Sequence, residues 1–181
     1  MDGFHSEFTD VKEAIGNAAL LPLRTKQKGP ALAQADLKKD IIDEAIYYFK
    51  SLIFFRNFEI KSNSDRVLVY LILYITECLK KFQRCNNKAT ATREMTNMGQ
   101  AKFPLPGENG FPLGVGNMFQ KPRDQAEADK LRAYFTQLRL ELGQRMVEKV
   151  YPSDSSEPSK WWLCFSKRKF LDQSLSAPGA L

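Results

Sequence analysis

The most apolar part of the chain is the run VLVYLILYI, which extends from Val67 to Ile75. A membrane-spanning helix needs roughly 20 apolar residues, so this nine-residue run is too short to cross a bilayer. Ser64 can cap a helix that begins just before the run, and Asp65 suits the positive end of the helix dipole. We therefore predict a helix from about Ser64 to Arg84 whose first half is buried on all sides.

The second half of this predicted helix is amphipathic. The charged residues that we expect to face water there are Glu77, Lys80, Lys81 and Arg84. A helix that is apolar nearly all round at one end needs other helices around it. The pattern therefore predicts a bundle with this helix at its centre.

Two other segments carry apolar residues at helical spacing. One extends from about Asp40, which can cap it, to Asn57. The other is longer, from about Asp124 to Val150, and Pro152 ends it. In the first, we expect these aromatic side chains to lie in the core: Tyr47, Tyr48, Phe54 and Phe55. In the second, we expect these basic side chains to face water: Arg132, Arg139 and Arg145.

Shorter helices complete the predicted fold. One extends from Thr92 to Met98 and is stopped by Gly99. A last one begins near Pro158, which a first helical turn tolerates, and continues toward Phe170. We therefore predict an all-α, multihelical single domain with about five helices, one of them enclosed by the others.

The domain prediction covers residues 1–181 as one unit with four parts. Residues 1–39 form an extended arm and residues 40–171 a helical core. Within the core, residues 101–122 form a docking loop rich in proline and glycine, which contains FPLPGENGFPL from Phe103 to Leu113. Residues 172–181 form a tail.

Charge and cysteine content restrict the function classes. The net charge of +6 is a modest excess that favours acidic partners without indicating nucleic acid or membrane. Three cysteines, an odd number without framework spacing, fit a reducing cytosol. The N-terminus has no basic region followed by an apolar stretch, so we expect no secretory signal.

The residues needed for catalysis, metal binding or nucleotide binding do not form any convincing set. His5 is the single histidine and lies near a terminus, which disfavours Ser-His-Asp and Cys-His catalysis. Cys78 and Cys85 have no second pair to complete a metal cluster. The segment Gly114–Gly116 lacks the remaining glycine and lysine of a nucleotide loop. We therefore expect no catalytic residue, no metal and no cofactor.

Three sets of residues are candidate sites of contact with partner molecules. They lie in the arm, in the docking loop and near the two tryptophans: Arg24, Lys26 and Lys28; Phe103, Pro104, Phe111 and Pro112; Trp161, Trp162, Lys167 and Arg168. Adjacent tryptophans point about 100° apart on a helix, so we expect one in the core and the other at a protein interface. The alternative is a basic helical nucleic-acid-binding module, because stacking and phosphate contacts use the same residue types.

Several long strings resemble one family. They are DIIDEAIYYFK from Asp40, YITECLKK from Tyr74, FPLPGE from Phe103 and PSKWW from Pro158. These strings, in this order, resemble the 21 kDa subunit (subunit 3) of the actin-related protein 2/3 complex. The resemblance covers nearly the whole chain, whereas residues 86–100 and 114–120 depart from the family pattern.

The resemblance implies an all-helical, non-catalytic structural subunit of a stable seven-subunit complex. Its expected partners are two actin-related proteins and the other small subunits, with actin filaments reached through the complex. It is expected to dock on the actin-related subunits, stabilise their active arrangement and so support filament nucleation and branching. Neither nucleic-acid binding nor membrane insertion is expected. The implied location is the cytoplasm, in the actin cytoskeleton and leading-edge cell projections.

Overall fold

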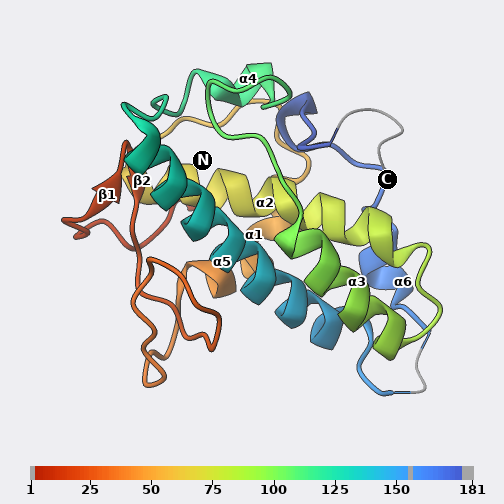
Figure 1. Ribbon diagram of the computed structural model, residues 1–181. Coiled ribbons are helices and arrows are strands. Elements are labelled where there is room, and N and C mark those ends of the chain that lie inside the picture. Colours follow the sequence, from red (N-terminus) through yellow and green to blue (C-terminus); the bar gives the residue numbers. More distant parts are fainter. Residues whose placement is uncertain (1–2, 155–156, 177–181) are drawn as a thin grey trace.

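A central helix, α2 (Asn63–Phe82), passes through the middle of the molecule (Figure 1). The computed structural model describes residues 3–154 and 157–176. Helices α1 (Ile41–Leu52) and α5 (Gln125–Val150) pack against α2, and α3 (Lys88–Gln100) packs mainly against α5. Every residue of α2 from position 67 to 79 is buried. The predicted all-α fold with an enclosed helix is confirmed.

No helix in the described part of the chain is both long and apolar enough to cross a membrane.

Polar side chains cap the longer helices. Asp40 caps α1 in a reciprocal arrangement with Asp43, in which each side chain accepts from the other residue's backbone N–H. The cap of α2 is Ser62, not the predicted Ser64. Ser64 lies inside the helix, where its hydroxyl donates to the carbonyl of Phe8. An alternative capping serine two residues upstream therefore explains the early start of α2.

The end of α1 is also corrected, to Leu52 from Asn57. Beyond it the chain turns so that its aromatic rings can pack on other segments. The ring of Phe55 lies 5.5 Å from that of Phe4, and the ring of Phe58 lies 6.2 Å from that of Phe170, between centroids. These contacts with both ends of the chain lie off the helical path, which explains why the helix stops.

Helix α3 is longer than predicted and includes Gly99, the residue expected to stop it. Asn87 caps it by accepting from the backbone of Thr90. A Cβ atom at Gly99 would lie 2.7 Å from Cδ2 of Leu140 on α5, so glycine lets the two helices approach closely. A tertiary contact, not a C-terminal stop, accounts for this glycine.

The predicted last helix is wrong beyond its first turn. Helix α6 covers only Lys160–Leu163, and a 3-10 turn, η1, follows at Phe170–Asp172. Leu171 and Asp172 have φ angles of 55° and 56°, a left-handed conformation that ends any regular helix there. A further short helix that was not predicted, α4 (Leu113–Gly116), interrupts the docking loop.

The N-terminal segment contains the antiparallel strands β1 (Ala14–Ile15) and β2 (Ala18–Ala19). Gly16 turns the chain between them with φ of 60°. After β2, side chains of α5 hold the arm: the hydroxyl of Tyr134 donates to the carbonyl of Ala19 and accepts from the N–H of Leu21. The arm residues that join the core are Ile15, Ala18, Ala19, Leu21, Leu23 and Ala31.

Glu77 was expected to face water but is fully buried on α2. Its carboxylate accepts hydrogen bonds from the hydroxyls of Ser174 and Ser176 and pairs with Lys80 at 3.1 Å. The C-terminal segment therefore folds back over α2, with Leu175 in the core. The remainder of the predicted tail, residues 177–181, lies outside the described residues.

Candidate partner-binding surface

The outer face of α1 leaves large side chains in water. The helix buries seven of its residues, including Phe49 and Leu52, against the core. Tyr47 and Lys50 occupy the opposite side, and Phe54 follows the helix end in the same direction. Tyr47 is 78% exposed and Phe54 is 55% exposed, which corrects their expected place in the core.

The segment around α6 lies against this face. The ring of Trp162 stacks on that of Phe49 at 6.1 Å between centroids, with 27° between the planes. The ammonium of Lys50 sits 4.3 Å from the centre of the Trp162 ring, a favourable cation–π contact. Phe165 meets Phe49 edge-on at 6.0 Å. These contacts fix the C-terminal segment on α1.

The two adjacent tryptophans differ sharply in environment. Trp162 is half-buried against α1, whereas Trp161 is 80% exposed. This is the difference that helical geometry predicts for neighbouring residues. An exposed tryptophan beside a fixed one is a rigid apolar projection, which suits an anchor for another protein.

Positive charge surrounds these rings. The guanidinium of Arg168 lies 5.1 Å from the centre of the Phe54 ring. The stretch from Ser159 to Phe170 contains four basic residues and no acidic one. Lys167 is exposed next to Arg168. We call this region the aromatic–basic surface and define it by these residues: Tyr47, Lys50, Phe54, Trp161, Trp162, Phe165, Lys167 and Arg168.

The basic residues of the arm divide into two kinds. Lys26 and Lys28 are exposed. Arg24 instead binds within the molecule, since its guanidinium donates to the carbonyl of Leu37 and to the carboxylate of Asp43. Arg24 therefore positions the arm, while the two lysines remain available at its surface.

The apolar residues of the docking loop are used mainly inside the molecule. Phe111 and Pro112 are buried, and the Phe111 ring packs edge-on against Phe119 at 5.6 Å. Phe103 and Pro104 are half-buried, and Phe103 covers the guanidinium of Arg139 at 4.6 Å. These side chains hold the loop in place more than they offer contacts to a partner.

Arg139 lies at the root of that loop and is almost completely buried, contrary to the water-facing position expected for it. Its guanidinium donates to the carbonyls of Gly99 and Ala101 and to the hydroxyl of Tyr70. The carbonyls at the C-terminal end of α3 supply the negative partial charge that this cation needs. Arg139 thus binds the backbone at the point where α3 ends and the docking loop begins.

The three predicted sets do not meet in one place. In Figure 1 the arm lies at the lower left, α4 and its loop at the top, and α6 at the right. Only the tryptophan set joins other exposed residues, those of α1. Helical spacing could have identified Tyr47 and Phe54, because both fall off the apolar stripe that contains Ile41, Ala45 and Phe49.

Within residues 3–154 and 157–176, no group of three or more His, Cys, Asp or Glu side chains could hold a metal ion. The rings of the aromatic–basic surface project from the molecule instead of lining a cavity, a shape more typical of protein interfaces than of small-molecule sites.

The family model and the curated relatives that match this chain carry the same subunit description. A family model described as P21-Arc, the ARPC3 (21 kDa) subunit of the ARP2/3 complex, matches residues 1–175. Actin-related protein 2/3 complex subunit 3 of Dictyostelium discoideum is 50% identical over 175 residues, covering 95% of this chain and 99% of that protein. Subunit 3 of Schizosaccharomyces pombe is 43% identical, covering 97% of this chain and 100% of that protein.

Proposed function

Because the chain belongs to the ARPC3 (21 kDa) subunit family of the ARP2/3 complex, we propose that it docks on the actin-related subunits and stabilises their active arrangement. The family is one of structural complex subunits and not of enzymes. In this role the chain supports nucleation and branching of actin filaments without catalysing a reaction. Its partners are the two actin-related proteins and the other small subunits of a seven-subunit complex.

The cellular setting follows from the same membership. The chain reaches actin filaments through the complex, in the cytoplasmic actin cytoskeleton and at leading-edge cell projections. Matches that cover 95% or more of this chain and of the Dictyostelium and Schizosaccharomyces relatives support this transfer.

The observation that supports docking most directly is the aromatic–basic surface. Three large rings, Tyr47, Phe54 and Trp161, are more than half exposed there. Burying such rings against a partner is strongly favourable, and tryptophan, tyrosine and arginine are the residues most often found at interface hot spots. The surrounding positive charge fits an acidic protein surface.

We expect the two tryptophans to have separable effects. Trp162→Ala removes the stacking on Phe49 and the contact with Lys50, and should lower the free energy of unfolding by about 2 kcal/mol. Trp161→Ala removes an exposed ring and should change stability by less than about 0.5 kcal/mol. It should instead weaken assembly roughly thirtyfold, as expected for a hot spot worth about 2 kcal/mol.

Stability is measured by thermal unfolding of the isolated chain. Assembly is measured by reconstituting the tagged chain with the remaining subunits in moderate salt. Arg168→Ala, next to Phe54, tests the charge of the surface, and Arg93→Ala, an exposed arginine on α3, is its matched control. Full assembly by both Trp161→Ala and Arg168→Ala would contradict the proposal. Recovery of nucleic acid with steeply salt-dependent affinity would favour the nucleic-acid-binding alternative.

A further inference from the structure

A hollow of about 630 Å³ lies between two stretches of the arm, and none of its lining residues belongs to the aromatic–basic surface. One wall is formed by residues 7–13 and the other by residues 20–22 and 30–34. The floor is apolar and partly open to water, and Leu32 on its rim is 68% exposed. The apolar lining residues are Phe8, Val11, Leu20, Leu21, Pro22, Pro30 and Leu32.

Buried polar groups on the core helices hold the first wall in place. The carboxylate of Glu44, fully buried on α1, accepts from the Ser6 hydroxyl at 2.8 Å and from the Glu7 backbone N–H at 2.9 Å. The hydroxyl of Ser64 on α2 donates to the Phe8 carbonyl. The path of residues 6–8 is therefore fixed by two core helices.

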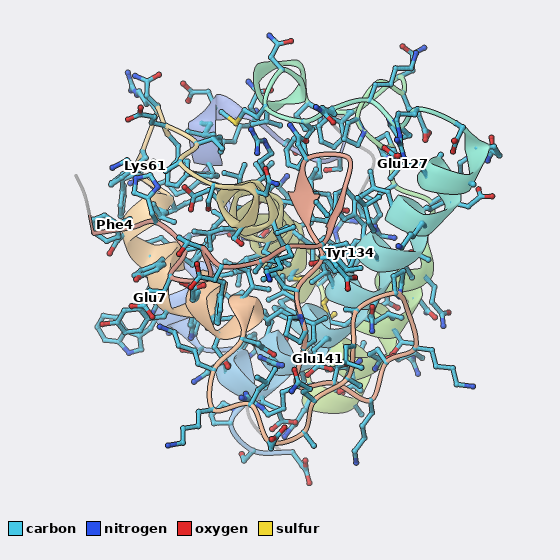
Figure 2. The ribbon with its side chains drawn as sticks, turned by 90° about the vertical axis from the view of Figure 1, so that its left-hand side faces the viewer. Phe4, Glu7, Lys61, Glu127, Tyr134 and Glu141 are labelled. Atoms are coloured by element: carbon cyan, nitrogen blue, oxygen red, sulfur yellow. The ribbon has the colours of Figure 1, made fainter. Side chains whose placement is uncertain are left out.

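The second wall is fixed by α5. The hydroxyl of Tyr134 accepts from the N–H of Leu21, and the side-chain amide of Gln137 bonds both backbone groups of Ala31. Figure 2 faces this side of the molecule, with Glu7 beside α1 and Tyr134 on α5. Both walls are thus formed before any partner binds, which lowers the entropic cost of binding.

The charge at this hollow has the opposite sign to that of the chain. Three acidic residues line it, Glu7, Asp10 and Glu13, against one basic residue, Lys12; Glu7 pairs with Lys39 at 3.3 Å, which leaves a local charge of −1. The whole chain has a net charge of +6. Within the described ranges, the carboxylates of Asp10 and Glu13 have no hydrogen-bond or ion-pair partner. We call the hollow the acidic groove.

We propose that the acidic groove binds a short segment of a partner protein in which Lys or Arg residues flank a bulky apolar side chain. The apolar side chain would cover the floor beside Leu32, and the cations would meet the carboxylates of Asp10 and Glu13. This goes beyond the docking function of the aromatic–basic surface. The two surfaces have opposite charge and therefore recognise different segments.

A direct test titrates the full chain with a short synthetic peptide of alternating Lys and Leu residues, and with a matched peptide of alternating Glu and Leu residues. We expect only the first to bind. The double variant Asp10→Lys/Glu13→Lys should raise its Kd by about tenfold or more, because favourable charge pairs become repulsive. Leu32→Ser tests the apolar rim at an exposed position, so it should leave folding unaffected and should also raise the Kd.

The matched control is Asp129→Lys, at an exposed carboxylate on α5 outside the groove, which should leave the Kd within about twofold. Equal binding of the Glu–Leu peptide would overturn the proposal. So would equal loss of binding in Asp129→Lys, or unchanged binding in the Leu32→Ser variant.

The natural source of the segment is identified in the assembled complex. A photoreactive phenylalanine analogue in place of Leu32 should crosslink to a neighbouring subunit at an apolar residue flanked by Lys or Arg. A crosslink to an acidic segment, to a second copy of this chain, or to no partner at all would overturn the assignment.

Discussion

The Asp40 carboxylate binds three different groups at the start of α1, one of them the backbone N–H of Arg24 at 3.0 Å. One oxygen accepts from the backbone N–H of Asp43 and caps the helix, and both oxygens receive the guanidinium of Arg145 from α5 at 2.6 and 2.7 Å. Arg145 was expected to face water, but its side chain is only 14% exposed, and it also donates to the carbonyl of Arg24. A single buried carboxylate therefore connects the first helix, the longest helix and the arm.

This pair predicts a pH dependence of stability. Burial by itself raises the pKa of the Asp40 carboxyl, but hydrogen bonds and charge from Arg145 outweigh burial and the pKa is lowered. A lowered pKa stabilises the fold at pH values above the unfolded-state pKa of about 3.9, and this contribution is lost as the pH falls through the folded-state pKa. Asp40→Asn keeps the cap and should cost about 2 kcal/mol at pH 7, because Arg145 loses its most buried charge partner while Asp43 and Glu141 remain paired with it.

The measurement is urea unfolding of the wild type and of Asp40→Asn at pH 7 and at pH 3, where their difference should shrink. Asp124→Asn is the matched control, since Asp124 caps α5 in the same way but makes no ion pair among the described residues. A difference that stays constant between the two pH values would contradict the assigned role of the ion pair.

Buried charges are the residues that the sequence predicted least well. Glu77 and Arg139 lie on helix faces that look water-facing from their own sequence neighbours. Their partners come from other parts of the chain: Ser174 and Ser176 for Glu77, and Gly99 and Ala101 for Arg139. Periodicity describes one helix at a time and carries no information about a segment that returns to cover it.

Among the elements, the attachment of the arm to α5 gives a sharp prediction. The side chain of Gln137 accepts from the N–H of Ala31 and donates to the carbonyls of Ala31 and Gln27. Gln137→Leu would leave buried backbone groups unpaired, so we expect the free energy of unfolding to fall by about 2–3 kcal/mol. Amide hydrogen exchange at Ala31 should accelerate while exchange in α2 changes less.

Gln144→Leu is the control, on the same helix and with the same change of side chain. Among the described residues Gln144 donates only to the Thr96 hydroxyl, so its replacement should cost less and leave the arm protected. Unchanged exchange at Ala31 in the Gln137→Leu variant would show that the arm is held by its apolar residues alone.

Long helices were predicted more accurately than short ones. The helices α1, α2 and α5 repeat their apolar pattern over several turns, so their existence and type were predicted, with errors at the ends. The single-turn helices α4 and α6 have no such repeat. Aromatic packing of Trp162 and Phe165 on α1 determines the path near α6, and that packing depends on contacts across more than a hundred positions.

At the level of the whole molecule, one apolar core extends from Ile15 to Leu175 and includes residues from the arm, every long helix and the C-terminal segment. We therefore expect the isolated chain to unfold in a single cooperative transition, as the single-domain prediction requires. The measurement is differential scanning calorimetry, in which the van't Hoff and calorimetric enthalpies should agree. Two resolved transitions would mean that the arm or the C-terminal segment unfolds separately.

Of the two candidate surfaces, the sequence indicated the aromatic–basic surface and not the acidic groove. Trp161 and Trp162 identified their region from the sequence, because two adjacent tryptophans cannot share one environment on a helix. The acidic groove was not predicted, because its two walls come from separate stretches and its floor forms only when both lie on the core helices. Sites built within one segment are visible in a sequence, and sites built between segments require the fold.

The hydrogen bonds that hold the arm also set an order of events during translation. Ala19 and Leu21 find their partner 113 or more positions later, at Tyr134, and Ala31 finds its partner 106 positions later, at Gln137. At typical synthesis rates the ribosome needs on the order of 10 s to cover that distance. Residues 19–31 therefore leave the ribosome long before the helix that receives them exists, and their hydrogen bonds to it form only after α5 emerges.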